Sequence, residues 1–208
     1  MHKPVGDAYE KITHALLYLA ASSPKSRLEK IKAIKLLYLA DRYHLRRYGR
    51  PITKDAYVAM TYGPVGTLAK DILEAQPIYV GEEPIEYARA HIDTKGYDYI
   101  PKREPNIQLF SESEKEALDF ALENFGKYKW NELIDLTHAF PEWTVHQSEL
   151  KKSGGMVPMN WLMFFDNPDP NNKDFKRFFS SGDVFEAITN PVAKESFIDR
   201  ERDATLWK

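Results

Sequence analysis

A single stretch, residues 26–48, constrains the fold more than any other part of the chain. It opens with Ser26-x-x-Glu29, which has the form of a capping box, where two side chains satisfy free backbone donors at a helix start. Apolar residues then recur at helical spacing, and the run from Leu36 to Ala40 is contiguous. Gly49 and Pro51 follow as a stop signal. Because a helical turn that is apolar all round must be buried all round, we expect this helix to pass through the middle of a domain.

The rest of the pattern predicts shorter elements around that helix. A strand is indicated at 56–62, and 76–106 is predicted to be a loop with short strands at 89–92 and 97–100. Further helices are predicted from Asp7 to near Ser22, at 64–75, from the Ser111-x-x-Glu114 capping box to Gly126, at 129–138, from Pro141 to Lys151, and at 158–165, 172–188 and 191–206.

The expected fold class follows from these elements. It is mainly α: a compact helical domain around a central buried helix, with a small β-hairpin or short antiparallel sheet. The serine and glycine residues of 152–155 form a break in the helical pattern. We therefore expect a domain at 1–150 and a helical C-terminal extension at 151–208, packed on that domain.

Composition narrows the class of protein. The 208 residues include no cysteine, which excludes disulfides, thiolate catalysis and cysteine zinc sites. No apolar run approaches the ~18 residues of a membrane span, and the first residues lack the apolar core of a signal peptide. We therefore expect a cytoplasmic protein that has no membrane partner.

No motif predicts catalysis or a bound cofactor. The chain has neither Gly-x-Ser-x-Gly nor His-Glu-x-x-His, and Asp41-x-x-His44 is the nearest approach to metal-ligand spacing. Tyr62-Gly63-Pro64-Val65-Gly66 has some features of a phosphate cradle, but its proline removes one donor, so a packed turn is the better interpretation. We expect no enzyme activity, no cofactor and no metal.

Basic charge is concentrated around the predicted central helix. Residues 25–54 contain ten basic and two acidic residues, so this segment carries +8 while the remainder of the chain carries −10. Three interpretations stay open: a docking surface for an acidic protein, a helix that contacts nucleic acid phosphates, or basic side chains that flank the core with solvated heads. The acidic remainder would repel DNA, which favours a protein partner over nucleic acid. The candidate contacts are Lys35, Arg42, Arg46 and Arg47 on the helix, with Tyr62 and Pro64 in the turn after it.

Four groups of residues occur in an order that resembles a known family. They are Ile34-Lys35-Leu36-Leu37-Tyr38-Leu39-Ala40-Asp41 with Gly49-Arg50-Pro51-Ile52, then Ala59-Met60-Thr61-Tyr62-Gly63-Pro64-Val65, then Phe110-Ser111-Glu112, and finally Leu136-Thr137-His138-x-x-Pro141-x-Trp143. This ordered set, over about 12–150, resembles the Panacea domain, the SocA-like antitoxin domain of bacterial and phage toxin–antitoxin systems.

The resemblance implies a function in binding. Such a domain neutralises a cognate toxin encoded nearby by direct protein–protein contact, and part of the family also delivers the toxin to a ClpXP-type protease. The alternative is a basic-helix DNA-binding regulator of its own operon, and an enzyme that uses a His/Asp site is a third hypothesis. The resemblance also marks motif positions that we expect to be mainly structural: Tyr38, Asp41, Gly63, Val65, Thr137, His138 and Trp143.

Overall fold

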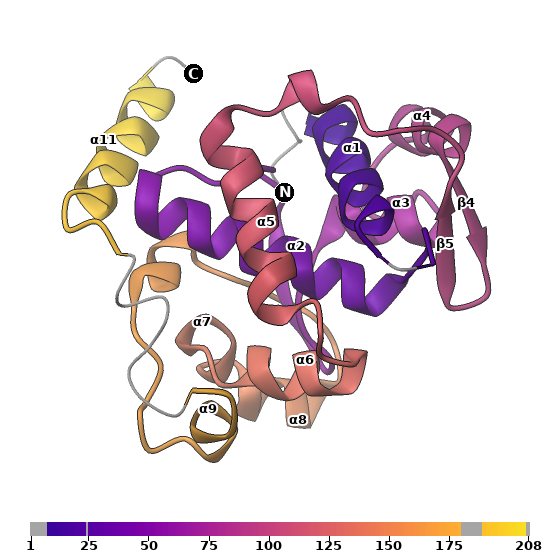
Figure 1. Cartoon of the computed structure of the whole chain (residues 1–208). Helices are drawn as coiled ribbons and strands as arrows, with labels where there is room; N and C mark the ends of the chain where they lie inside the picture. The colour runs from indigo at the N-terminus through magenta and orange to yellow at the C-terminus, as the bar shows by residue number, and fades with distance from the viewer. Residues whose placement is uncertain (1–7, 24, 180–188, 207–208) are drawn as a thin grey trace.

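One long helix, α2 (Lys30–Tyr48), runs through the centre of the protein (Figure 1). The structure is a computed structural model, and it describes residues 8–23, 25–179 and 189–206. Helices α1 (Ala8–Ala21) and α5 (Glu112–Phe125) pack against α2. Every residue of α2 from Lys35 to Arg46 is buried, so the prediction of a central buried helix is confirmed.

The two ends of α2 were not equally predictable. At the C-terminal end, Gly49 has a φ of 66° and its N–H donates to the carbonyl four residues earlier at 2.8 Å, as the stop signal predicts. At the other end, the capping box predicted at Ser26 is wrong. Leu28–Glu29 forms strand β1 and pairs with β5 (Asp98–Pro101), so the helix begins only at Lys30. A long-range strand pairing therefore takes the place of the local cap.

Shorter helices surround α2. The Ser111–Glu114 capping box opens α5 as predicted, whereas the helix predicted from Pro141 to Lys151 is divided in two. The segment predicted at 158–165 contains a 3₁₀ helix instead of an α-helix. The Asp7 cap, and the part of the 172–188 prediction beyond 179, lie outside the described residues. The helices not yet given are α3 (Thr67–Glu74), α4 (Glu82–His91), α6 (Trp130–His138), α7 (Pro141–Thr144), α8 (Gln147–Ser153), α9 (Lys173–Phe178) and α11 (Ala193–Leu206), with 3₁₀ helices at Ile107–Leu109 and Trp161–Phe165.

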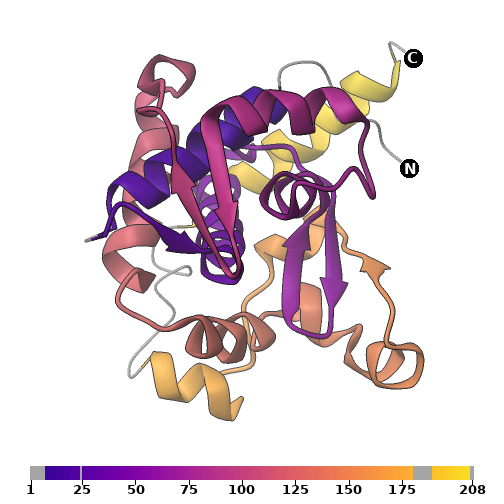
Figure 2. The same cartoon turned by 90° about the vertical axis from the view of Figure 1, so that its right-hand side faces the viewer.

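Two small antiparallel sheets accompany the helices. One has the strand order β3-β2-β6, formed by Gly63–Gly66, Tyr57–Met60 and Val157–Pro158. The other has the order β1-β5-β4, with β4 at Ile92–Lys95. Figure 2 shows the two hairpins, β2–β3 and β4–β5, as separate pairs of arrows. The expected fold class, helix-dominated with small antiparallel sheets, is confirmed.

The helix predicted at 64–75 begins later than expected. Residues Gly63–Gly66 pair with β2 as strand β3, so α3 starts only at Thr67. Pro64 is tolerated in this strand because β3 is at the edge of its sheet, where a missing N–H interrupts no ladder. Pro64, which was expected in the first turn of a helix, lies instead in an edge strand.

Helix α4 was missed, and the strand predicted at 89–92 is mostly its last turn. Pro84 lies in the first turn of α4, where its missing N–H costs nothing. Ile85 and Ala88 are buried at helical spacing. The density of prolines in this segment obscured that spacing. The strand predicted at 97–100 does correspond to β5.

The described part of residues 151–208 packs against the elements that precede it. Strand β6 pairs with β2, and α11 lies beside α2. The contact at Gly49 is so close that a Cβ there would lie 2.5 Å from the carbonyl oxygen of Ala193. Within the described ranges, no helix is both long enough and apolar enough to cross a membrane.

Candidate functional site

The basic residues predicted to form an exposed face on α2 lie mostly inside the protein. The exposed fractions of Lys35, Arg42 and Arg46 are 1%, 0% and 1%. The prediction that these three form a contact surface is therefore wrong, because neighbouring elements cover α2 on all sides. Arg47 is exposed and lies 3.4 Å from the Glu116 carboxylate. The basic helical face on which the DNA-binding alternative depended is not on the surface.

Arg42 forms a buried ion pair with Glu142 of α7. Its Nε donates to Glu142 Oε1 at 2.8 Å, and both side chains are fully buried. The Tyr38 hydroxyl donates to the same oxygen at 2.5 Å, and the guanidinium lies 4.2 Å from the centre of the Phe140 ring. Nη2 of Arg42 also donates to the Asp166 carbonyl at 2.8 Å. Because removing either charged partner would leave the other buried and unpaired, this cluster fixes α7 to α2.

Arg46 connects α2 to the C-terminal segment. Its Nη1 donates to the carbonyls of Phe164 at 3.2 Å and Asp166 at 3.1 Å, and its Nη2 donates to Asn167 Oδ1 at 2.5 Å. Its Nε donates to Thr189 Oγ1 at 2.8 Å. These four acceptors are uncharged and come from a segment more than a hundred residues away. The second buried arginine therefore has a structural role that its sequence surroundings did not reveal.

Lys35 lies beneath the turn that connects β2 to β3. Its Nζ donates to the Pro64 carbonyl at 2.7 Å, and burial lowers the pKa of this ammonium group to about 7. Gly63 has a φ of 93°, and a Cβ at this position would lie 2.8 Å from both Lys35 Nζ and Thr137 Oγ1. Gly63 is therefore required by its backbone conformation and by the close approach of two buried side chains.

Asp41 organises the chain that follows α2. Its carboxylate accepts hydrogen bonds from the Ile52 N–H at 2.7 Å, the Thr53 N–H at 3.0 Å and the Tyr57 hydroxyl at 2.9 Å. The Thr53 hydroxyl donates to it as well. Burial raises the pKa of Asp41 to about 6, although these donors oppose the rise. This motif residue thus serves the fold, as expected for it.

Asp55 is a buried acid that the sequence analysis missed. Its carboxylate accepts from the Leu68 N–H at 3.0 Å and the Ala69 N–H at 2.9 Å, and so caps the start of α3 from outside the helix. Burial raises the pKa of Asp55 to about 7. A Cβ at Gly66 would lie 2.3 Å from Asp55 Oδ2, which explains the second glycine of the motif. The sequence did contain one sign of this interaction. The N-cap residue of α3 is Gly66, which has no side chain that could cap the helix.

The turn between β2 and β3 is supported by α6 and α7. Trp143 Nε1 donates to the Met60 carbonyl at 2.9 Å, and the His138 ring stacks on Trp143 with 3.6 Å between centroids and 10° between planes. Burial, and then the charge of Lys35, lower the pKa of His138 to about 4, so this ring is neutral at pH 7. Two aromatic side chains therefore hold the turn in place.

Tyr62 differs from the other motif residues for which a contact or structural role was predicted. It is 63% exposed, whereas Pro64 and Val65 beside it are buried. His138 is half-buried, and the remaining motif positions are buried: Lys35, Tyr38, Asp41, Gly63, Thr137 and Trp143. Packing explains all of these except Tyr62. That most of the motif is structural stays a prediction, and the burial of these residues is the observation on which it now rests.

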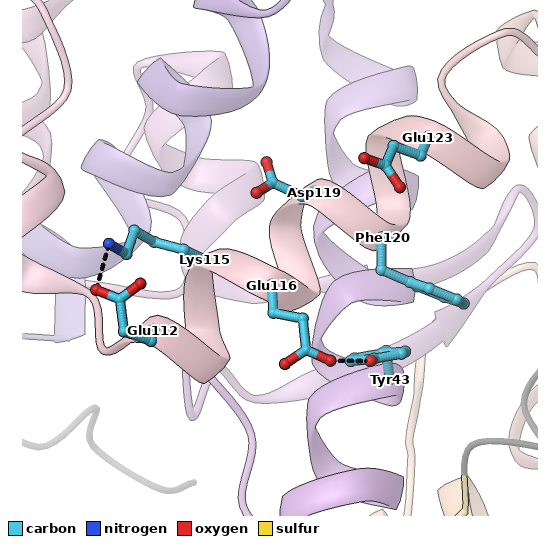
Figure 3. Close-up of a pocket in the computed structure, with 7 residues that line it drawn as sticks. All are labelled: Tyr43, Glu112, Lys115, Glu116, Asp119, Phe120 and Glu123. Atoms are coloured by element: carbon cyan, nitrogen blue, oxygen red, sulfur yellow. Dashed lines mark hydrogen bonds and ion pairs between the residues drawn. The ribbon is translucent and has the colours of Figure 1, made fainter.

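An open groove of about 510 Å³ lies over α5 and was not predicted. Figure 3 shows its lining, in which Tyr43 and Phe120 are bordered by one lysine and four carboxylates. Glu116 accepts from the Tyr43 hydroxyl and from Tyr48, and Asp119 accepts from Tyr18. The carboxylates lie at positions 112, 116, 119 and 123, a helical spacing that the sequence did contain. Among the residues that the structure describes, no group of three or more histidines and acids could hold a metal ion.

Comparison with known proteins gives one match. Residues 34–144, just over half of the chain, match the family described as antitoxin SocA-like, Panacea domain. No curated protein and no solved structure matches the chain significantly. The matched span begins in α2 and ends with α7, so it contains the buried ion pair, the β2–β3 hairpin and the aromatic side chains that support it. The chain therefore belongs to the SocA-like antitoxin family, whose characteristic unit is the Panacea domain.

Proposed function

We propose that this protein is an antitoxin that binds a cognate toxin protein encoded nearby and neutralises it by direct contact. The observation that carries the proposal is the family match over 34–144. The matched segment is a continuous packed unit from α2 to α7, whose polar motif residues bond to one another or to the backbone. Such a unit is suited to presenting a fixed surface to a partner.

A binding role, and not a catalytic one, also agrees with where the buried titratable residues lie. Lys35, Asp41 and Asp55 have shifted pKa values, which elsewhere can mark an active site. Here all three are buried and engaged with backbone groups, so a substrate cannot reach them. Their pKa shifts are the consequence of structural burial.

We further propose that neutralisation works by sequestration. The toxin would be held in a stable complex in the cytoplasm, where both proteins are made, and delivery to a ClpXP-type protease would not be needed. This distinguishes the proposal from the adaptor mechanism that the family resemblance also implies. In a strain that lacks that protease, the antitoxin should still protect the cell.

Co-expression with the adjacent gene tests the proposal. Induction of that gene alone should stop growth, and co-expression of the full chain should restore growth and yield a complex that co-purifies and elutes as one species in gel filtration. The same rescue in a strain without the ClpXP protease identifies sequestration. A harmless neighbouring protein that never co-purifies would contradict the antitoxin function, and rescue that is lost with the protease would contradict sequestration alone.

A further inference from the structure

We propose that the turn end of the β2–β3 hairpin is the surface that contacts the toxin, with Tyr62, Val145 and Met156 as its apolar contacts. This inference rests on the proposed antitoxin function and names the surface that would carry it out. The three side chains are 63%, 56% and 41% exposed. Large exposed apolar side chains that gather in one place are typical of protein interaction sites.

The three residues lie on different segments that meet at one end of β2. Tyr62 is in the turn itself. The carbonyl of the last β2 residue accepts a hydrogen bond from Trp143, two residues before Val145. The preceding β2 residue pairs with Val157 of β6, which directly follows Met156. Figure 2 shows the purple hairpin ending beside the salmon helices α6–α8, with the orange strand β6 alongside it. The turn, the α7–α8 connection and the start of β6 therefore border a common surface.

The support under Tyr62 is rigid, although Tyr62 does not contribute to it. Among the described residues, its side chain makes no hydrogen bond and no ring contact. On either side of it, the Met60 carbonyl accepts a hydrogen bond from Trp143 and Gly63 is packed against Lys35. An exposed aromatic side chain on a fixed backbone loses little conformational entropy on binding, which is the property of an interface hot spot.

The charge of helix α8, next to this surface, indicates the chemistry of the partner. Helix α8 packs Leu150 against the small cluster that contains Trp143, and its other face is exposed. That helix carries two lysines in its last turn, Lys151 and Lys152, against one glutamate. Neither lysine forms an ion pair with a described residue. The surface therefore fits a toxin that offers an apolar recess for the Tyr62 ring, bordered by carboxylates.

The groove on α5 is the competing surface, and it predicts the opposite chemistry. Its four carboxylates would attract a basic partner, but two of them are already held by tyrosine hydroxyls and one by a lysine. Among the polar side chains of the described lining residues, only the exposed Glu123 carboxylate has neither a hydrogen bond nor an ion pair. It therefore supplies the control surface for the experiment.

The experiment is isothermal titration of the full chain with the purified product of the adjacent gene. Tyr62→Ala is expected to weaken Kd by at least about tenfold, as truncation of an aromatic hot spot does. Val145→Asp and Met156→Asp are expected to weaken Kd by a similar factor, because each places a charge in the contact. The matched control is Tyr97→Ala, which removes a 90% exposed tyrosine from the turn of the other hairpin and should change Kd by less than about twofold.

A second pair of variants tests the charge of the partner. Lys151→Glu combined with Lys152→Glu should weaken binding several-fold and reduce its dependence on salt, because rim charges act through screened electrostatics. Glu112→Lys combined with Glu123→Lys reverses exposed charges on α5 and should leave Kd within about twofold. If the lysine reversal strengthens binding, the assigned partner chemistry is overturned.

The outcomes separate this inference from the function on which it rests. If Tyr62→Ala and Val145→Asp both bind with the wild-type Kd, the proposal that the hairpin surface contacts the toxin is overturned, and the antitoxin function is unaffected. Loss of binding on reversal of the α5 charges, with Tyr62→Ala neutral, overturns it in favour of the groove. No binding by the wild-type chain overturns the function and the surface together. Unchanged thermal unfolding of Tyr62→Ala identifies a loss of contact and not of folding.

Discussion

The two β-hairpins of this protein have the same length but very different surroundings. Each joins two four-residue strands through a two-residue turn that contains an exposed tyrosine. In β2–β3, every strand residue except Met60 is buried, and α2 and α6 pack against β3. In β4–β5, only Ile92 and Tyr99 are buried. The difference teaches that similar hairpins can be either part of the core or an edge feature, depending on what packs against them.

Each hairpin also has an ion pair nearby, and the two pairs are not equivalent. Arg42 and Glu142, which link α2 to the α7 helix that supports the β2–β3 turn, are completely buried. Arg27 and Asp98, beside β5, lie 3.5 Å apart with exposed side-chain fractions of 50% and 28%. Exposed pairs contribute little to stability, whereas breaking a buried pair is costly. Substitutions at matched positions of the two hairpins therefore test whether β2–β3 belongs to the core.

The largest expected effect comes from the two ion pairs. Arg42→Ala should lower the free energy of unfolding by about 3–5 kcal/mol, because it leaves the Glu142 carboxylate buried without its charged partner. Arg27→Ala, at the exposed pair, should lower it by less than about 1 kcal/mol. Urea denaturation followed by circular dichroism measures both. Similar losses in the two variants would contradict the difference between the hairpins.

The next effect depends on pH and concerns Lys35 behind the β2–β3 turn. Burial lowers its folded-state pKa from 10.5 to about 7, so between these values the unfolded chain binds a proton that the folded chain does not. This group therefore makes stability rise with pH from about 7 to 10.5, and its effect levels off below about 7, where Lys35 is protonated in both the folded and the unfolded state.

Lys35→Met should remove this rise, which is roughly 1–4 kcal/mol by linkage. Lys95→Met, at an exposed position of strand β4, is the matched control variant. Denaturation at a series of pH values between 7 and 10 gives the slopes. Parallel profiles of stability against pH for Lys35→Met and the wild type would show that folded Lys35 keeps its proton over this pH range. That result would contradict the lowering of its pKa by burial.

A smaller effect is expected from a glycine in each hairpin. Gly63 has a φ of 93° and close contacts, whereas Gly96 has a φ of 59° and open space around its Cα. Gly63→Ala should therefore cost about 2–3 kcal/mol, from backbone strain and displaced buried groups. Gly96→Ala should cost only about 1 kcal/mol, the strain of a left-handed conformation. Thermal unfolding compares the two, and equal costs would show that the β2–β3 turn has room to relax.

The sequence predicted the features that depend on local contacts and missed those that depend on contacts between distant segments. Helix α2 and its end at Gly49 were predicted because periodicity and a glycine stop are local signals. The start of α2 was wrong because Leu28 pairs with Tyr99, seventy residues further along the chain. Arg42 and Arg46 looked like surface residues because their acceptors are also distant in sequence. Spacing along a helix cannot reveal a carbonyl that packs against it from another segment.

The candidate site was predicted in the same partial way. The motif residues were identified together, and the structure gathers Lys35, Gly63 and Thr137 around one turn. Asp55 was missed because it caps a helix that begins twelve residues later, beyond the reach of a local capping pattern. Among the motif residues for which a contact or structural role was predicted, Tyr62 is the one to which neither the sequence nor the structure assigns a structural role. A residue that the fold does not require is the one for which a binding role has to be tested.

The smallest expected effect is on stability at the two turns. Tyr62→Ala and Tyr97→Ala should each change the free energy of unfolding by less than about 0.5 kcal/mol, since both side chains are mostly exposed. Thermal unfolding of the free protein measures this. Equal stability combined with unequal toxin binding would show that the buried hairpin presents its tyrosine to a partner. A loss of stability above about 1 kcal/mol in Tyr62→Ala would instead assign Tyr62 to the core with the rest of the motif.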